Sequence, residues 1–203
     1  MAQAQTADGS NKLDSHADTC VAGGNMVVLE HTGTTVDVNP YTPEYNALTN
    51  IEVATCATAV TCPTTGQNYV LVFGQMLHFG DQLPYSLLCP NQICSKGHTV
   101  DDTPRQFDPK STHLITFRDY NGNPKLTIPL EVDGVISTFC SRLPTQDELD
   151  HLEKIVVTDE HQWDPHLDKL ALQEQRTVTT LPLLPQVTIA SVSIADGGRL
   201  HER

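Results

Sequence analysis

The chain has 203 residues, of which 12 are Lys or Arg and 25 are Asp or Glu, so its formal net charge at pH 7 is −13. This acidic balance disfavours nucleic acid and anionic membranes as main partners, because both attract positively charged surfaces. With 38% hydrophobic residues the chain is too apolar to be disordered throughout, and no apolar run reaches the roughly 18 residues of a membrane-spanning helix. We therefore expect one folded domain plus a loose segment, in an intracellular, cytoplasmic protein without an export signal.

Residues 1–12 are small and polar, and we predict that they form a disordered N-terminus. From Leu13 to about residue 140, short runs rich in Val, Thr, Ile and aromatic residues alternate with Gly, Pro and Asn. This texture is typical of strands, so the fold class is predicted to be mainly β. The expected strands cover residues 26–29, 34–38, 51–61, 69–79, 113–117, 125–130 and 135–139.

Two hairpins are expected from turn residues between these strands. The two longest strands flank residues 63–68, which contain Pro63 and Gly66. Asn121 and Gly122 indicate a second hairpin between the strands near residues 115 and 127.

Little helix is expected. Residues 90–95 fit one short helix. Thr145 and Glu148 have the spacing of a capping box and precede apolar residues at helical spacing, which predicts a helix over residues 145–156. Residues 158–203 have no sustained period and are predicted to be a mostly loose tail.

The chain contains six cysteines, and without an export signal we expect reduced thiols rather than a disulfide framework. The tightest group of metal-ligand residue types is Cys89, Cys94 and His98. Its spacing differs from the paired Cys-x-x-Cys pattern of zinc sites, so no metal is expected. A small zinc-binding structural domain that uses these three residues is kept as an alternative.

The segment with the clearest chemical content is residues 13–19, which read Leu-Asp-Ser-His-Ala-Asp-Thr. Asp14 stands between an apolar and a hydroxylic residue, and a second acid, Asp18, follows four positions later. By spacing alone, such a carboxylate is a turn former or a cap, because Asp and Ser side chains accept hydrogen bonds from nearby backbone N–H groups.

The same segment resembles the active-site loop of retropepsins, the single-lobe aspartic proteases of retroviruses and LTR retrotransposons. The family pattern is an apolar residue, Asp, Ser or Thr, Gly and Ala, and only His16, in place of glycine, departs from it. A second block, residues 85–100, follows the apolar run 75–80 and resembles the later strand and short helix of the copia-type form. The resemblance covers residues 12–140 and points to the protease region of a copia-type retrotransposon polyprotein.

For the fold, the resemblance implies a retropepsin-like single-lobe acid protease barrel with one short helix over residues 13–103. Residues 104–140 would be a β-hairpin extension similar to the stretch before the integrase. Residues 141–203 would be a partly helical, partly disordered tail. We expect the chain to be a protease-containing fragment of such a polyprotein, in the cytoplasm or within virus-like particles.

For function, the resemblance implies an aspartic endopeptidase that processes its polyprotein as a homodimer without a cofactor. Each chain would supply one catalytic residue, Asp14, beside the dimer axis. Two adjacent carboxyls cannot both ionise, so they would share one proton and activate a water molecule. Ser15 would hold the two loops in register, and Ala17 and Asp18 would border the substrate peptide.

Two further residues are expected to bind substrate. The hairpin that contains Gly66 would be the flap that closes over the peptide, and Leu87 would contact the peptide from the second block.

Two departures leave a second function open. His16 adds a side chain to a tight loop beside the catalytic water, and Cys89-Pro90 stands where retroviral members have Gly-Arg, so Asp18 lacks the family's ion-pair partner. The alternative is therefore a catalytically impaired retropepsin-like module that dimerises or binds peptides.

Overall fold

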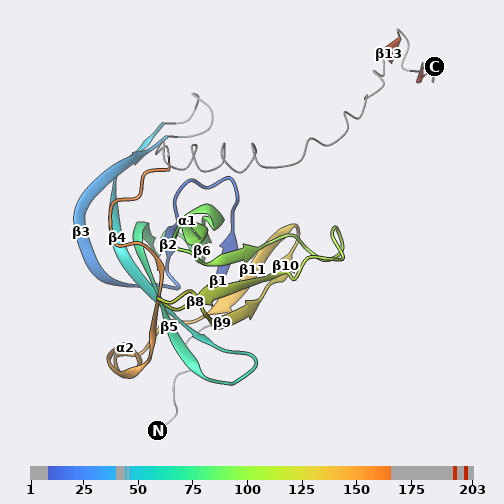
Figure 1. Ribbon diagram of the computed structural model, residues 1–203. Helices are drawn as coiled ribbons and strands as arrows, with labels where there is room; N and C mark the ends of the chain where they lie inside the picture. The colour runs from blue at the N-terminus through green and yellow to red at the C-terminus, as the bar shows by residue number, and fades with distance from the viewer. Residues whose placement is uncertain (1–8, 40–43, 45, 166–193, 196–198, 201–203) are drawn as a thin grey trace. The chain divides into compact units, whose positions relative to one another are not determined.

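The computed structural model describes residues 9–39, 44, 46–165, 194–195 and 199–200, and these are mainly β (Figure 1). The chain divides into two compact units, residues 1–165 and 166–203. The strands of the first unit are β1 (Gly9–Leu13), β2 (Val21–Gly23), β3 (Val27–Val38), β4 (Leu48–Thr61), β5 (Asn68–Gly80), β6 (Ser86–Leu88), β7 (Thr99–Asp101), β8 (Leu114–Arg118), β9 (Pro124–Pro129), β10 (Glu131–Asp133), β11 (Ile136–Ser141) and β12 (Lys154–Thr158).

Two short helices complete the first unit, α1 (Pro90–Ser95) and α2 (Gln146–His151). In the second unit, β13 (Ile194–Ala195) pairs with β14 (Arg199–Leu200). Among the residues that the structure describes, no helix has the length and apolar character needed to cross a membrane.

Nine strands form one sheet in the order β10-β11-β1-β6-β2-β5-β4-β3, with β12 also paired to β5. Strands β7, β8 and β9 form a second, three-stranded sheet. The path of the large sheet has two ends, β10 and β3, so no closed barrel is found among the described strands. The predicted mainly-β class is confirmed.

The predicted strands are all present. The runs 26–29 and 34–38 belong to one long strand, β3, and the other five runs correspond to β4, β5, β8, β9 and β11. Both predicted hairpins are also confirmed, and their turns place Gly66 at φ +72° and Gly122 at φ +81°. Such left-handed backbone is accessible to glycine at little steric cost.

The core joins both sheets, which corrects the expected boundary at residue 103. Phe73 of β5, Phe117 of β8 and Phe139 of β11 are fully or almost fully buried in one apolar cluster. Strand β11 also pairs antiparallel with β1, with Lys12 opposite Thr138. Residues 104–140 are therefore part of the same compact unit rather than an extension of it.

The expected disordered N-terminus is wrong for residues 9–12, which lie in β1. Asn11 is fully buried there, and its side-chain amide donates to the Ser141 hydroxyl at 2.8 Å. A polar segment is thus ordered by buried hydrogen bonds rather than by apolar side chains. Residues 1–8 lie outside the described part of the chain.

The helix expected over residues 145–156 ends at His151, and the remainder of that range enters β12. The residues Ile155, Val156 and Val157 are β-branched, and burial alternates along them with the period of a strand. Pairing of Ile155 with Leu71 in β5 favours the observed strand over the predicted helix in this segment. The loose tail predicted for residues 158–203 is wrong at its start, because Thr158 ends β12 and both Glu160 and Trp163 are hydrogen-bonded to the folded unit. Most of residues 166–203 lie outside the described residues.

Helix α2 is attached to the sheet by an ion pair at its first turn. Thr145 and Glu148 form the predicted capping box, and the Arg142 guanidinium donates to both Glu148 carboxylate oxygens at 2.6 and 2.5 Å. The backbone of Arg142 pairs with Ala59 of β4. The hydrogen bonds from Arg142 lower the pKa of Glu148 from 4.5 to about 2.

We expect Glu148→Gln to lower the free energy of unfolding at pH 7 by about 1–3 kcal/mol, because the variant loses a charge-assisted bidentate interaction. The folded pKa of Glu148 is lowered, so this stabilisation is present above pH 4.5 and is lost as the pH falls towards 2. Denaturant unfolding of both proteins between pH 7 and 2 measures the difference.

Asp147→Asn is the matched control, because the Asp147 side chain is 86% exposed in the same helical turn. It should change stability by less than about 0.5 kcal/mol. A Glu148→Gln effect that persists at pH 2 would contradict the assignment.

Candidate active site

Residues 14–20, the Asp14 loop, connect β1 to β2 at one end of β6. Strand β6 lies between them: it pairs parallel with β1, with Leu88 beside Leu13, and antiparallel with β2, with Leu87 opposite Val21. The Asp14 backbone N–H continues the first pairing and donates to the Leu88 carbonyl at 3.0 Å. The segment 13–19 and the block 85–100 are therefore adjacent in the structure.

The Asp14 side chain forms a turn with the backbone that follows it. Its Oδ1 accepts from the His16 backbone N–H at 2.9 Å, and its carbonyl accepts from the Ala17 N–H at 3.2 Å. This is the turn chemistry expected of Asp by spacing alone. The carboxylate nevertheless remains 41% exposed at the surface of a single chain.

The neighbouring loop residues are mostly at the surface. Ser15 and Asp18 are exposed, and Ala17 is partly buried against the core. The His16 side chain is 96% exposed, and its Nδ1 lies 4.0 Å from Asp14 Oδ1. When protonated, His16 can pair with Asp14.

Buried groups of α1 hold the far end of the loop. Gln92 is 1% exposed, and its Oε1 accepts from the Cys20 backbone N–H at 2.8 Å. Its amide donates to the Gln75 carbonyl at 3.4 Å, while the Cys20 carbonyl accepts from the Leu77 N–H at 3.0 Å. One glutamine thus links the loop, helix α1 and strand β5.

Two buried thiols lie beside this glutamine. Cys20 Sγ accepts from the Cys89 backbone N–H at 3.2 Å, and Cys89 caps α1. Burial raises the pKa of Cys20 far above its ordinary value and also raises that of Cys89. With their pKa values raised, both side chains are neutral thiols, whereas the nucleophilic form of cysteine is the thiolate. Their role here is therefore to hold the backbone.

A network of buried polar side chains connects the strands that carry the loop. The Ser86 hydroxyl of β6 accepts from the Gly23 N–H at 3.0 Å and donates to Asn25 at 2.7 Å. The Asn25 amide donates in turn to Asn11 at 3.0 Å. Strands β1, β2 and β6 are fixed to one another by these bonds, so the loop they carry has a defined position.

A cleft of about 480 Å³ lies beside the Asp14 loop. Residues 16–19 form one side of it. The rest of its lining comes from β3, β4, β5 and the chain after β12: Thr34, Val36, Asp37, Val38, Asn39, Val53, Gln75, Leu77, Gln162, Trp163 and Pro165. Of the expected loop residues, His16, Ala17 and Asp18 line this cleft, whose size suits peptide side chains, whereas Asp14 and Ser15 stand just before the lining residues in the chain.

Gly66 does not lie near this cleft. It stands 11 residues before Leu77, the β5 residue bonded to the loop, which corresponds to roughly 36 Å along an extended chain. The register of β4 and β5 places this turn beyond the Thr61–Asn68 pair, at the end of the two strands remote from the Val53–Leu77 pair that lines the cleft. Gly66 is not among the residues that line the cleft, whereas the far part of β3 lines it opposite the loop.

Leu87 is half-buried on β6 between β1 and β2. It is a neighbour of the loop, and it does not line the cleft.

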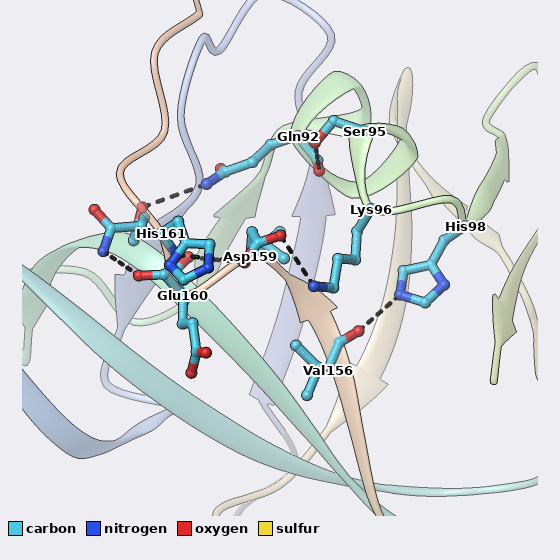
Figure 2. Close-up of polar contacts among 11 residues, drawn as sticks. Gln92, Ser95, Lys96, His98, Val156, Asp159, Glu160 and His161 are labelled. Carbon is cyan, nitrogen blue, oxygen red and sulfur yellow. Dashed lines mark hydrogen bonds and ion pairs between the residues drawn. The ribbon is translucent and has the colours of Figure 1, made fainter. Parts of the chain in front are cut away.

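The chain after β12 was not expected to contribute. Figure 2 shows Lys96 directed at Asp159, with Nζ 3.0 Å from Oδ2, and His98 directed at the Val156 carbonyl at 2.8 Å. Further along, the Trp163 indole N–H donates to the Asp18 carbonyl at 2.7 Å. Little in the sequence indicated this contact of Trp163, because a single Trp in a polar segment belongs to no periodic pattern that would identify its partner.

The zinc alternative is not supported by the arrangement of Cys89, Cys94 and His98. Both ring nitrogens of His98 are already bonded, Nδ1 as acceptor from the Arg118 N–H at 3.0 Å and Nε2 to Val156. In the parts of the chain that the structure describes, no group of three or more His, Cys, Asp or Glu residues is placed to hold a metal ion.

Comparisons of the chain with models of protein families, with curated proteins and with solved structures find no match.

We expect Gln92→Leu to lower the free energy of unfolding by about 1–3 kcal/mol, because the Cys20 N–H loses its buried acceptor. Hydrogen exchange at Cys20 should also become faster, which reports on the loop itself. Asn91→Leu, the same kind of change on the exposed face of α1, is the control and should leave both quantities nearly unchanged. Equal effects of the two variants would show that Gln92 does not hold the loop.

Proposed function

We propose that this chain is an aspartic endopeptidase of the retropepsin type, active as a homodimer in which each chain contributes Asp14. The observation that carries the proposal is the direct hydrogen bond between the two resembling blocks, from the Asp14 N–H to the Leu88 carbonyl at 3.0 Å. Two segments 74 residues apart in the sequence were matched to the family separately, by residue type alone. Their contact is what a common origin with that family requires.

The exposure of Asp14 also supports the proposal. A carboxylate that needs an identical partner must lie where a second chain can reach it, and Asp14 is 41% exposed at the surface. Its backbone is held by β6, while its side chain is held only by the adjacent turn. The residue combines a fixed position with access for a second copy.

In the proposed dimer, the two Asp14 carboxyls lie about 3 Å apart and share one proton, as in aspartic proteases generally. The ionised member removes a proton from a bound water, and the protonated member polarises the scissile carbonyl. The titration belongs to the pair rather than to either residue. Ser15 hydrogen-bonds across the axis and keeps the two loops in register.

The peptide lies in the cleft beside Ala17 and Asp18. The far part of β3 and the edge it exposes cover the cleft, the role first assigned to the hairpin at Gly66. An extended substrate can add its backbone to such an edge as a further strand. By the resemblance, the substrate is the polyprotein of a copia-type retrotransposon, and the chain is a retropepsin-like single lobe.

His16 supports a second candidate, a module that dimerises or binds peptides without cutting them. Its N–H already donates to Asp14 Oδ1, and its ring lies 4.0 Å from the same oxygen. In a dimer, two imidazoles would stand beside the shared pair and compete for the catalytic proton.

Asp14→Asn should abolish peptide-library cleavage between pH 4 and 7, lowering the rate roughly 10³-fold or more because the general acid–base pair is lost. Asp150→Asn, on the exposed surface of α2, is the control and should cleave as the wild type does. Cleavage that is unaffected by Asp14→Asn would overturn the proposal.

His16→Gly separates the two candidates, since it keeps the N–H that bonds Asp14 and removes the ring. If the wild-type chain is a protease, both proteins cleave. If it is an impaired module, the wild type binds peptides without cleavage and the glycine variant gains activity.

A further inference from the structure

Residues 159–165, the C-terminal strap, contribute Gln162, Trp163 and Pro165 to the lining of the cleft, although they lie outside the region of resemblance. Three contacts fix the strap in place. Lys96, the C-cap residue of α1, pairs with Asp159 at 3.0 Å, the Gln75 amide donates to the Glu160 carbonyl at 2.9 Å, and the Trp163 indole N–H donates to the Asp18 carbonyl at 2.7 Å. Figure 2 shows the first of these, with Glu160 and His161 following Asp159 along the strap. The strap is thus bonded to α1, to β5 and to the Asp14 loop in turn.

Trp163 brings an aromatic surface to the cleft. Its N–H, the polar end of the indole, is already satisfied by the Asp18 carbonyl, and its side chain is half-buried. The remainder of the ring is apolar and borders the cleft. Val36, Val38, Val53 and Leu77 line the same cleft from β3, β4 and β5. A large apolar side chain placed between the indole ring and these aliphatic residues would be removed from water by contact with both.

The charges at the cleft have one sign. Asp18 and Asp37 line it, together with His16, and none of the described residues that line it is Lys or Arg. The chain as a whole has a net charge of −13. Charge complementarity therefore favours a ligand with positive charges beside the apolar group and disfavours an acidic one.

We propose that Trp163 is a specificity-determining residue of the cleft, forming a subsite for a large apolar side chain of an extended peptide that carries Lys or Arg on either side. This inference rests on the proposed function, because it assumes that the cleft is the peptide groove of the protease. It adds the class of peptide selected and the residue that selects it.

Trp163 is the single tryptophan of the chain, so its fluorescence reports on the subsite directly. The probe is a nine-residue peptide with 4-nitrophenylalanine, a fluorescence quencher, as its central residue and two lysines on each side of it. The full chain carries Asp14→Asn, so that the peptide is not cut. We expect saturable quenching, and at least about ten-fold weaker binding when glutamates replace the lysines.

Variants then test the indole itself, with binding followed by the anisotropy of the same peptide labelled with fluorescein. Trp163→Ala should weaken binding about ten-fold or more, as expected for a central aromatic contact. Trp163→Phe keeps most of the apolar surface and should weaken it less. Tyr120→Ala removes an aromatic side chain that is 97% exposed and does not line the cleft, so it should bind as the parent does.

Absence of saturable quenching would overturn the proposal, as would unchanged binding by both Trp163 variants. Tighter binding by Trp163→Ala would also overturn it, because the strap would then obstruct the cleft. If Trp163→Ala does not fold, as judged by circular dichroism, the Trp163→Phe comparison decides. A wild-type chain that binds the basic peptide without cutting any peptide refutes the protease proposal and leaves the subsite intact.

Discussion

The pairing of β6 with two strands at once is the constraint on which the rest of the site depends. Strand β1 leads into the Asp14 loop and β2 leads out of it, and both are hydrogen-bonded to the three residues of β6. The loop therefore has to bulge from the end of the sheet, and Asp14 occupies its first position. Buried bonds from the Cys20 N–H to Gln92 and from the Gly23 N–H to Ser86 reduce the freedom of the end that leads into β2.

The cleft is assembled from parts of the chain that are far apart in sequence. The loop supplies one side, β3 to β5 supply an apolar side, and the chain after β12 supplies Trp163. Helix α1 and its C-cap residue connect these parts, since Gln92 of the helix bonds the loop while the cap, Lys96, bonds the strap. A short helix of six residues thus positions both the proposed catalytic loop and the proposed specificity residue.

Local sequence predicted the strands because β-branched runs and turn residues act over a few neighbours. It also predicted the turn at Asp14, because the side chain of Asp14 bonds the backbone N–H of His16 two residues later. Local sequence failed where pairing between distant segments decides the structure. Residues 152–156 fit a helix by their own spacing, but pairing of Ile155 with Leu71 of β5 makes this segment a strand. The turn residues at Gly66 predict a hairpin but not which part of the fold lies beside it. The contribution of Trp163 was not predicted for the same reason, because the hydrogen bond from its indole N–H crosses 145 residues of sequence.

The central claim is that two Asp14 residues from two chains form one active site, and subunit mixing tests it most directly. Wild-type chain and Asp14→Asn chain are denatured together in equal amounts, refolded and assayed at constant total protein. If each site needs both carboxyls, random pairing leaves about one quarter of the activity of the same total of wild-type chain. Retention of about one half would mean that each chain acts alone and would contradict the account.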